Sequence, residues 1–580
     1  MSVPTKETHP KEKSLVGAKG KLTLKGYTPG MKVCTRFPPE PSGYLHLGHM
    51  KAAMLNDYYA HSNGGQLILR FDDTNPLKES QEYVDNIIRD LKTIGIVADK
   101  VSYTSDYFDM LMEYGDKILK MGKAYIDDMD PEEMHKGRME GIESPNRNNT
   151  LEKNLEMWEE MKKGTEKGKK CVMRGKIDMK HKNKALRDPS LWRCIDATHY
   201  RTGNKYKVYP LYDFGVSIID STEGVTHALR SQEYSDRAPL YDWVVDIFGM
   251  RKPIIEVFSR MNFAYVLLSK RNLNLFVQKK LVDGWYDPRF PTIQGLLRRG
   301  LTLEAMKEFC LSQGSSKNIN LMEMEKIWAI NKKVIDPIVP RYNAVLKTGA
   351  CKVTLDTPQE EEKEVALHKK NESLGTKKMT FGKEAYIDGD DAKSIAANEE
   401  VTFMDWGNVI FDKIEGETAA AHLHLDGDFK LTKKKLTWIS TKDTVDLELR
   451  EFDYLITVPK IEEGMELEKY INPKSLEIFQ AIGESAMKTL KEGDKIQIQR
   501  HGYFRVDKAF DGNKIILNKI PDGTEKGPKV KAEIEVKEKK QKKQTKDDKE
   551  DHPNRDLKKE KEAKEKKEQA KAQKKAQEKK

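Results

Sequence analysis

The chain has 580 residues, of which 37% are hydrophobic and 34% are charged, and its formal net charge is +10. This length predicts three or four domains, and the composition excludes fibrous and wholly disordered chains. No stretch approaches the roughly 20 apolar residues that cross a bilayer, and the polar, Lys-rich start resembles neither a secretory signal nor a transit peptide. We therefore expect a cytoplasmic protein without membrane contact.

The spacing of the cysteines argues against two classes of site. No two of the five cysteines lie close together in the sequence, which argues against a disulfide framework and against a four-Cys zinc module.

The C-terminal segment is rich in charge. Residues 531–580 contain 19 Lys and one Arg against 13 acidic residues. We interpret this segment first as a solvated tail or a Lys-rich helix, and second as a polyanion-binding appendage.

The first half of the chain alternates strands and helices. MKVCTRF (31–37) predicts a strand, the breaker-rich turn PPEPSG follows, and a helix is expected over 47–61. QLILRFD (66–72) predicts a second strand that ends at an Asp-Asp-Thr-Asn-Pro turn, and apolar spacing predicts a helix within 78–93. Such alternation is typical of a doubly wound parallel sheet, which binds ligands beyond the carboxyl ends of its strands. Both turns lie at such ends.

Later segments change character. A charged segment with helical character and the strand-like run CVMRGKIDM interrupt the alternation over about 131–205, which predicts an insertion. The alternation of strands and helices resumes over 206–275. A mainly helical stretch (276–342) follows. From 343 to 530, short runs such as CKVTL, KMTF, HLHL, VDLEL and YLITV predict antiparallel barrels.

Two histidines stand at the start of the first predicted helix. His46 and His49 are three residues apart, so both rings can face one side. The positive end of a helix attracts phosphate, and two imidazoles with backbone N–H groups can stabilise charge growing on a triphosphate. Half of a metal site, or two surface histidines, explains the four letters HLGH equally well.

The sequence around these histidines resembles that of one protein family. RFPPEPSGYLHLGH resembles the HIGH motif of class I aminoacyl-tRNA synthetases, in the form used by their glutamyl and glutaminyl branch. The resemblance continues, in the family's order, through RFDDTNP, YPLYDF, EGVTHALR, SRMNFAYVLLSKR, DGWYDPRFPTIQGLLRRG and KVIDPIVPRY. Several long motifs in order are far more specific than any one of them.

The resemblance implies a multidomain α/β plus all-β architecture. Its expected parts are an N-terminal extension (1–30), a Rossmann-like catalytic domain in two halves (31–130 and 206–275), an insertion for the tRNA acceptor end (131–205), a helical connecting region (276–342), anticodon-binding β-barrels (343–530) and the tail (531–580). No long interaction domain precedes the catalytic domain, so membership of a multi-synthetase complex stays open.

The resemblance also implies the site residues. Leu267-Leu268-Ser269-Lys270-Arg271 stands in place of the family's KMSKS loop, with Leu268 for Met. The expected catalytic residues are His46, His49 and Lys270. The expected ATP site contains Glu40, Pro41, Ser42, His46, Gly48, His49, Ser231, Glu233, Arg260, Met261, Leu268, Ser269, Lys270 and Arg271. The expected glutamate site contains Arg36, Phe37, Pro38, Asp72, Tyr212, Asp213, Phe214, Gly215, Val216 and Arg230, and no metal ligand is expected.

Charge complementarity explains three members of the glutamate site. Asp72 can receive the substrate ammonium, although an Asx-turn cap is its alternative role, which Asp73 or Asn75 could fill instead. Arg36 can hold a carboxylate bidentately. Arg230 distinguishes the two branches, because glutaminyl enzymes generally carry Cys at the corresponding position and a buried side-chain carboxylate needs a cationic partner.

The implied reaction is adenylation followed by transfer. The α-carboxylate of L-glutamate attacks the α-phosphate of ATP, bound with Mg²⁺, and the terminal ribose of tRNA(Glu) then displaces AMP. Positioning and charge stabilisation supply the acceleration, so no nucleophilic residue is required. The alternatives are a glutaminyl-tRNA synthetase, a non-catalytic tRNA-binding scaffold, and a small-molecule nucleotidyltransferase, which would not need the barrels.

Overall fold

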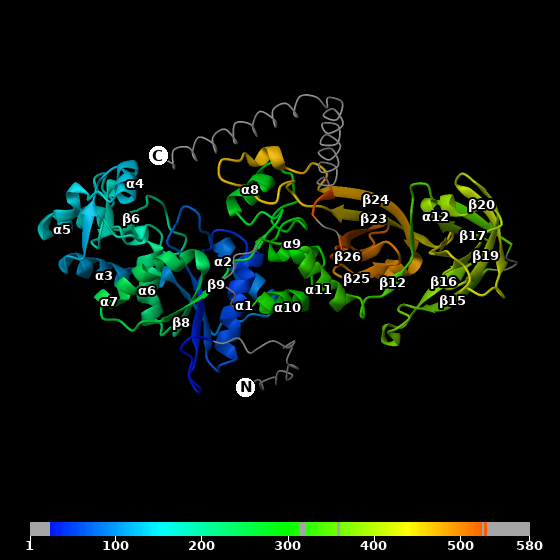
Figure 1. Cartoon of the computed structure of the whole chain (residues 1–580), viewed down its shortest axis with the longest axis horizontal. Helices are drawn as coiled ribbons and strands as arrows, with labels where there is room; N and C mark the ends of the chain where they lie inside the picture. The colour runs from blue at the N-terminus through cyan, green and yellow to red at the C-terminus, as the bar shows by residue number, and fades with distance from the viewer. Residues whose placement is uncertain (1–23, 314–320, 357–359, 525–526, 530–580) are drawn as a thin grey trace, which may run out of the picture.

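The computed structural model describes residues 24–313, 321–356, 360–524 and 527–529 (Figure 1). The predicted Lys-rich tail and most of the N-terminal extension lie outside these residues. The molecule is elongated, with the predicted insertion at one end and a β-rich lobe at the other. None of the described helices is long and apolar enough to cross a membrane.

Five parallel strands form the sheet of the predicted catalytic domain: β1 (Cys34–Phe37), β2 (Gln66–Phe71), β3 (Lys100–Tyr103), β8 (His227–Ser231) and β9 (Ile254–Phe258). β2 pairs with β1 and β3, whereas β8 pairs with β9. The two groups meet at β1 and β8, where the Thr226 N–H donates to the Cys34 carbonyl at 2.9 Å and Arg36 Nη1 donates to the Leu229 carbonyl at 3.0 Å. The strand order reverses here, which is where doubly wound folds bind ligands.

Helices on the crossover connections cover this sheet: α1 (Leu47–His61), α2 (Gln81–Thr93), α6 (Tyr212–Thr222) and α7 (Ala238–Ile247). α1 has the bounds predicted from the sequence. It ends before Gly64, whose φ of 61° lies in the left-handed region that glycine adopts at little cost. α2 begins later than residue 78 because the Ser80 side chain caps it by accepting the Tyr83 N–H.

The insertion is an antiparallel sheet with its own helices. Its strands are β4 (Ala124–Asp127), β5 (Val172–Gly175), β6 (Ser190–Cys194) and β7 (Val208–Pro210), and α3 (Phe108–Lys120), α4 (Pro131–Glu140) and α5 (Leu151–Lys163) accompany them. β4 and β7 therefore extend the sheet beyond 131–205 on both sides. Trp158 and Trp192 are buried in one core with Phe214 of α6, so the insertion is packed firmly against the second half of the catalytic domain.

The connecting region is helical, with short strands. It contains α8 (Lys270–Gln278), α9 (Ile293–Arg298), α10 (Leu303–Gln313) and α11 (Glu325–Ile335), and β10 (Asn262–Phe263) pairs with β11 (Leu321–Met322). α9 begins beside α1, because the Leu47 N–H donates to the Pro291 carbonyl and the Ile293 N–H donates to the Leu45 carbonyl, both at 3.1 Å. The histidine turn is thus fixed from both sides.

Two seven-stranded, barrel-like sheets follow, as predicted. The first contains β12 (Arg341–Tyr342), β13 (Ala344–Leu346), β23 (Thr444–Phe452), β24 (Leu476–Glu484), β25 (Lys495–Ile498), β26 (Gly502–Lys508) and β27 (Lys514–Ile520). The second contains β14 (Cys351–Leu355), β17 (Glu384–Ile387), β18 (Glu400–Phe403), β19 (Gly407–Glu415), β20 (Thr418–His424), β21 (Lys435–Leu436) and β22 (Ile439–Ser440). The hairpin of β15 (Glu361–Ala366) with β16 (Thr376–Phe381) and helix α12 (Gly389–Ser394) accompany them.

Two details of the barrels differ from the prediction. The sheets are mainly antiparallel, but β12–β25, β23–β27, β14–β20 and β18–β21 pair in parallel. The expected strand YLITV is wrong, since Ile456 forms only an isolated bridge with Ile471. Leu455 and Ile456 instead pack against Leu273 and Phe276 of α8, so a helix rather than a sheet buries this apolar run.

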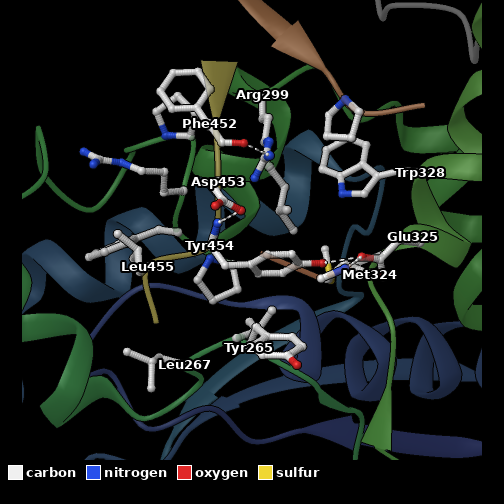
Figure 2. Close-up of a pocket in the computed structure, with 18 of the residues that line it drawn as sticks. Tyr265, Leu267, Arg299, Met324, Glu325, Trp328, Phe452, Asp453, Tyr454 and Leu455 are labelled. Atoms are coloured by element: carbon white, nitrogen blue, oxygen red, sulfur yellow. Dashed lines mark hydrogen bonds between the residues drawn. The ribbon is translucent and has the colours of Figure 1, made fainter. Parts of the chain in front are cut away.

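A pocket marks the junction between the connecting region and the first barrel (Figure 2). Tyr454 Oη donates to Glu325 Oε1 at 2.9 Å, and Arg299 Nη2 donates to the Phe452 carbonyl at 2.8 Å. The ring of Tyr265 lies 5.6 Å from that of Tyr454, and the Tyr265 N–H donates to the Pro459 carbonyl at 2.9 Å. The segment that leads into Leu268-Ser269-Lys270 is therefore attached to the connection between β23 and β24 of the first barrel.

Candidate active site

The two histidines lie at the N-terminus of α1, beyond the carboxyl end of β1. His46 is the N-cap residue, and its Nδ1 accepts the Gly48 N–H at 3.1 Å. His49 Nδ1 accepts the His46 N–H at 3.2 Å, and the two rings are stacked with centroids 3.8 Å apart. In a neutral imidazole whose Nδ1 accepts, the proton is on Nε2, so each ring keeps one N–H to donate to a ligand.

Both histidines are uncharged at neutral pH. Burial, reinforced by the cations of Arg260 and Lys270, lowers the pKa of His46 to about 3. Burial and the neighbouring His46 lower the pKa of His49 well below its ordinary value. The pair can therefore stabilise a phosphate by hydrogen bonding and not by carrying a charge.

Lys270, the first residue of α8, lies beside the turn that precedes the two histidines. Its Nζ donates to Ser42 Oγ at 2.8 Å. A Cβ on Gly43 would come within 3.2 Å of Lys270 Cδ, so glycine at this position lets the lysine lie against the turn. Burial lowers the Lys270 pKa, and the acidic side chains of Glu40 and Glu79 oppose that shift.

Four further members of the expected ATP site, Glu233, Arg260, Ser269 and Arg271, are partly or fully exposed. Arg260 Nη1 lies 3.0 Å from Glu233 Oε2, and both side chains are partly exposed. Ser269 is the exposed N-cap residue of α8, with the exposed Arg271 two positions on. Met261, in contrast, is only 1% exposed and packs in the core beneath the site. Its side chain is therefore not exposed at the site.

Arg230 lies at the end of β8 with incomplete hydrogen bonding. Its side chain is 2% exposed, and its Nη2 is 3.4 Å from Asp213 Oδ1. Nε and Nη1 are buried and have no hydrogen-bond partner among the described residues. The guanidinium carbon lies 5.3 Å from the ring centroids of Tyr234 and Tyr241, within reach of cation–π attraction. A buried cation with two open donors is poised to bind an anion.

Arg36 is placed differently from the sequence prediction. Its Nε is 3.0 Å from both oxygens of Asp220, and its Nη1 donates to the Leu229 carbonyl. Only Nη2 is left without a partner in the described part of the chain. With this arrangement Arg36 has no pair of donors open for a bidentate hold on a substrate carboxylate, because Asp220, 184 residues away in sequence, accepts from Nε and the Leu229 carbonyl accepts from Nη1.

Asp72 and Asp73 differ in how many hydrogen bonds they form within the protein, which separates a structural role in this turn from a role in binding the substrate ammonium. Asp73 accepts the Ser105 N–H at 2.8 Å and the Ser105 hydroxyl at 2.6 Å, so it fills the structural role. Asp72 Oδ1 accepts only long bonds from Thr74 at 3.3 Å and Thr104 at 3.5 Å, and no ion pair to it is found among the described residues. Burial, with Glu40 nearby, raises the pKa of Asp72 to about 6.

The expected glutamate residues do not all face the same space. Pro38, Asp72, Tyr212, Gly215 and Val216 line one small cavity together with Arg70 and Thr104. Phe37 and Phe214 point into two hydrophobic cores instead, and the Phe214 ring lies 5.7 Å from that of Trp192.

Sequence reasoning missed Asp220, Tyr241 and Arg237. Tyr241 Oη donates to Asp220 Oδ2 at 3.0 Å, and Arg237 Nη1 lies 2.5 Å from Asp213 Oδ2. The spacing of Asp213 and Asp220, seven residues apart on one helix, is the signal that could have placed both on the face toward the arginines. No group of three or more His, Cys, Asp or Glu side chains in the described ranges is arranged to hold a metal ion.

The chain is similar to known proteins over most of its length. Residues 32–337 match the family model described as the catalytic domain of class I tRNA synthetases (E and Q), and residues 339–426 and 435–507 match that group's anti-codon binding domains. The cytoplasmic glutamate–tRNA ligase of Arabidopsis thaliana is 50% identical, covering 85% of this chain and 70% of the relative. That of Saccharomyces cerevisiae is 49% identical, again over 85% and 70%. The bifunctional glutamate/proline–tRNA ligase of Mus musculus is 44% identical over 88% of this chain and 35% of the relative.

These matches include the turn that carries His46 and His49, the loop that carries Lys270 and most strands of both barrel-like sheets. The chain belongs to the class I tRNA synthetases of the E and Q group.

Proposed function

We propose that the protein is a glutamate–tRNA ligase, which activates L-glutamate with ATP and transfers it to the 3′-terminal ribose of tRNA(Glu). The names of the relatives support this proposal. The observation that carries it is Arg230, a buried guanidinium whose Nε and Nη1 have no partner among the described residues. A side-chain carboxylate would supply both the missing acceptors and the missing charge, whereas the amide of glutamine supplies an acceptor only.

The amino acid would lie between the ends of β1 and β8. Its ammonium would meet Asp72, whose carboxylate has no cation partner in the described chain. Its side-chain carboxylate would meet Arg230. Arg36 contributes one donor, Nη2, and mainly supports the pocket through its ion pair with Asp220.

ATP would bind as its Mg²⁺ complex, with the metal belonging to the substrate. The triphosphate would lie at the N-terminus of α1, where Nε2–H groups of His46 and His49 and the helix dipole favour negative charge. Lys270 would leave Ser42 for the triphosphate in the transition state. The α-carboxylate of glutamate then attacks the α-phosphate, the bond to pyrophosphate breaks, and no residue of the protein forms a covalent intermediate.

The other segments of the chain take up the tRNA in this proposal. The insertion (131–205) would hold the acceptor end near Arg230, and the barrels (343–530) would hold the anticodon, in line with the family description of 339–426 and 435–507. The connecting region (276–342) would join the two. Because the relatives are named cytoplasmic, the proposed compartment is the cytoplasm.

The test is ATP–pyrophosphate exchange and tRNA charging with glutamate and glutamine, each with and without tRNA. We expect charging with glutamate only, and exchange that depends strongly on tRNA, because the glutamyl and glutaminyl synthetases resembled by this chain assemble their amino-acid site with tRNA bound. Charging with glutamine would overturn the assignment to glutamate. Binding of tRNA without any exchange would favour a non-catalytic scaffold.

A further inference from the structure

One carboxylate of the protein already lies beside the arginine that the substrate needs. Asp213 is the second residue of α6, and its side chain is 8% exposed. Its Oδ1 lies 3.4 Å from Arg230 Nη2, whereas its Oδ2 lies 2.5 Å from Arg237 Nη1. Asp213 thus bridges a buried arginine and an exposed one, since the side chain of Arg237 is 53% exposed.

The two contacts of Asp213 are unequal in geometry. A separation of 3.4 Å between Arg230 and Asp213 is at the outer limit of a hydrogen bond, whereas 2.5 Å to Arg237 is a short, charge-assisted contact. Asp213 therefore neutralises part of the charge of Arg230 without taking up its Nε and Nη1 donors. The N-terminus of α6 adds a favourable field for this carboxylate.

There is room for Asp213 to move toward Arg237. A cavity of about 290 Å³ lies on that side, lined by Arg138, Leu211, Tyr212, Asp213, Arg237 and Leu240. A rotation of the Asp213 side chain into this space would keep its ion pair with Arg237. It would also end the contact with Arg230.

We propose that Asp213 is an internal competitor for the carboxylate site of Arg230 and that Arg237 sets the affinity for glutamate by drawing Asp213 away. This inference rests on the proposed function, in which the substrate side-chain carboxylate meets Arg230. Two carboxylates cannot share one buried guanidinium without repulsion, so the substrate binds as Asp213 shifts to Arg237. Arg237 is then a positioning residue that acts through Asp213 and does not touch the substrate.

The competition model predicts opposite signs for two variants. Removing the exposed partner with Arg237→Ala leaves Asp213 to Arg230 alone and should raise the KM for glutamate by about two- to fivefold, the range of a partly exposed ion pair. The conservative Arg237→Lys should restore most of the wild-type KM. Asp213→Asn removes the competitor and should lower the KM for glutamate, while the KM for ATP stays near that of wild type. The melting temperature should fall, because the buried Arg230 loses the one carboxylate with which it forms an ion pair among the described residues.

The experiment is tRNA charging at saturating ATP and tRNA, with kcat and KM for glutamate measured for wild type, the three single variants and the double variant. In the Asp213→Asn background, Arg237→Ala should have no further effect. If Asp213→Asn raises the KM, or if Arg237→Ala acts equally in both backgrounds, the two residues are structural and the inference is overturned. Charging of glutamine by the wild type would overturn the proposed function as well, so the two failures are distinguishable.

Discussion

The two halves of the active site differ in how far the chain satisfies its own polar groups. In the ATP half, Lys270 donates to Ser42, and each histidine accepts a backbone N–H. In the amino-acid half, Arg230 keeps two buried donors and Arg36 keeps one without a partner among the described residues. ATP must therefore exchange an existing contact for a new one, whereas glutamate supplies partners that the pocket lacks. Variants in the two halves should accordingly fail in different ways.

The largest expected effect is in the amino-acid half, where the buried donors lack partners among the described residues. Arg230→Cys leaves the substrate side-chain carboxylate unpaired in a buried pocket, at a cost of roughly 3 to 5 kcal/mol. This corresponds to a loss of about two to four decades in kcat/KM for glutamate. Glutamine should lose much less, because its amide does not need the cation, and the Kd for tRNA should stay the same. An equal loss for both amino acids would make Arg230 structural.

The next largest effect is in the ATP half of the site. Lys270→Ala removes a cation from the developing charge on the triphosphate and should lower the rate of adenylate formation by roughly two to three decades. Single-turnover formation of adenylate measures this rate, and tRNA binding should change little. The matched control is Lys279→Ala at the other end of α8, where the lysine pairs with Glu468 on the surface. A similar loss in the control would assign the effect to the helix and not to Lys270.

The pH profile should separate the two halves as well. Burial and the nearby Glu40 raise the pKa of Asp72 to about 6, and only the ionised form can receive the substrate ammonium. As the pH falls through about 6, kcat/KM for glutamate should decrease by roughly tenfold per unit. The KM for ATP should not follow, since His46 has a pKa of about 3 and stays neutral over this range. Asp72→Asn should lower the activity and abolish the step near pH 6.

The smallest effect tests the exchange of contacts directly. Ser42→Ala removes the hydrogen-bond acceptor of Lys270, and a single hydrogen bond of this kind is worth about 1 kcal/mol. The KM for ATP should fall by up to roughly fivefold with kcat nearly unchanged. A rise in the KM for ATP would mean that Ser42 binds the nucleotide itself. The proposed difference in hydrogen bonding between the ATP half and the amino-acid half would then be wrong.

The sequence by itself determined the local elements and the chemistry of the motifs. Helix α1 has its predicted bounds, because a breaker-rich turn precedes it and an Asn-Gly-Gly turn follows it. The strand and helix alternation predicted the doubly wound sheet, and the resemblance of the ordered motifs to class I aminoacyl-tRNA synthetases predicted an adenylating enzyme. Hydrophobic period and turn chemistry act over a few residues, so the sequence displays them directly.

Only the tertiary structure decided which polar partners each arginine receives. Asp220 accepts from Nε of Arg36, and Asp213 lies between Arg230 and Arg237. The same holds for YLITV, whose apolar residues are buried by α8 and not by a neighbouring strand. Ion pairs and core contacts join residues far apart in the chain, and neither residue type nor spacing specifies which of several carboxylates will reach a given cation. That choice follows from the packing of β1, β8 and α6 around one pocket.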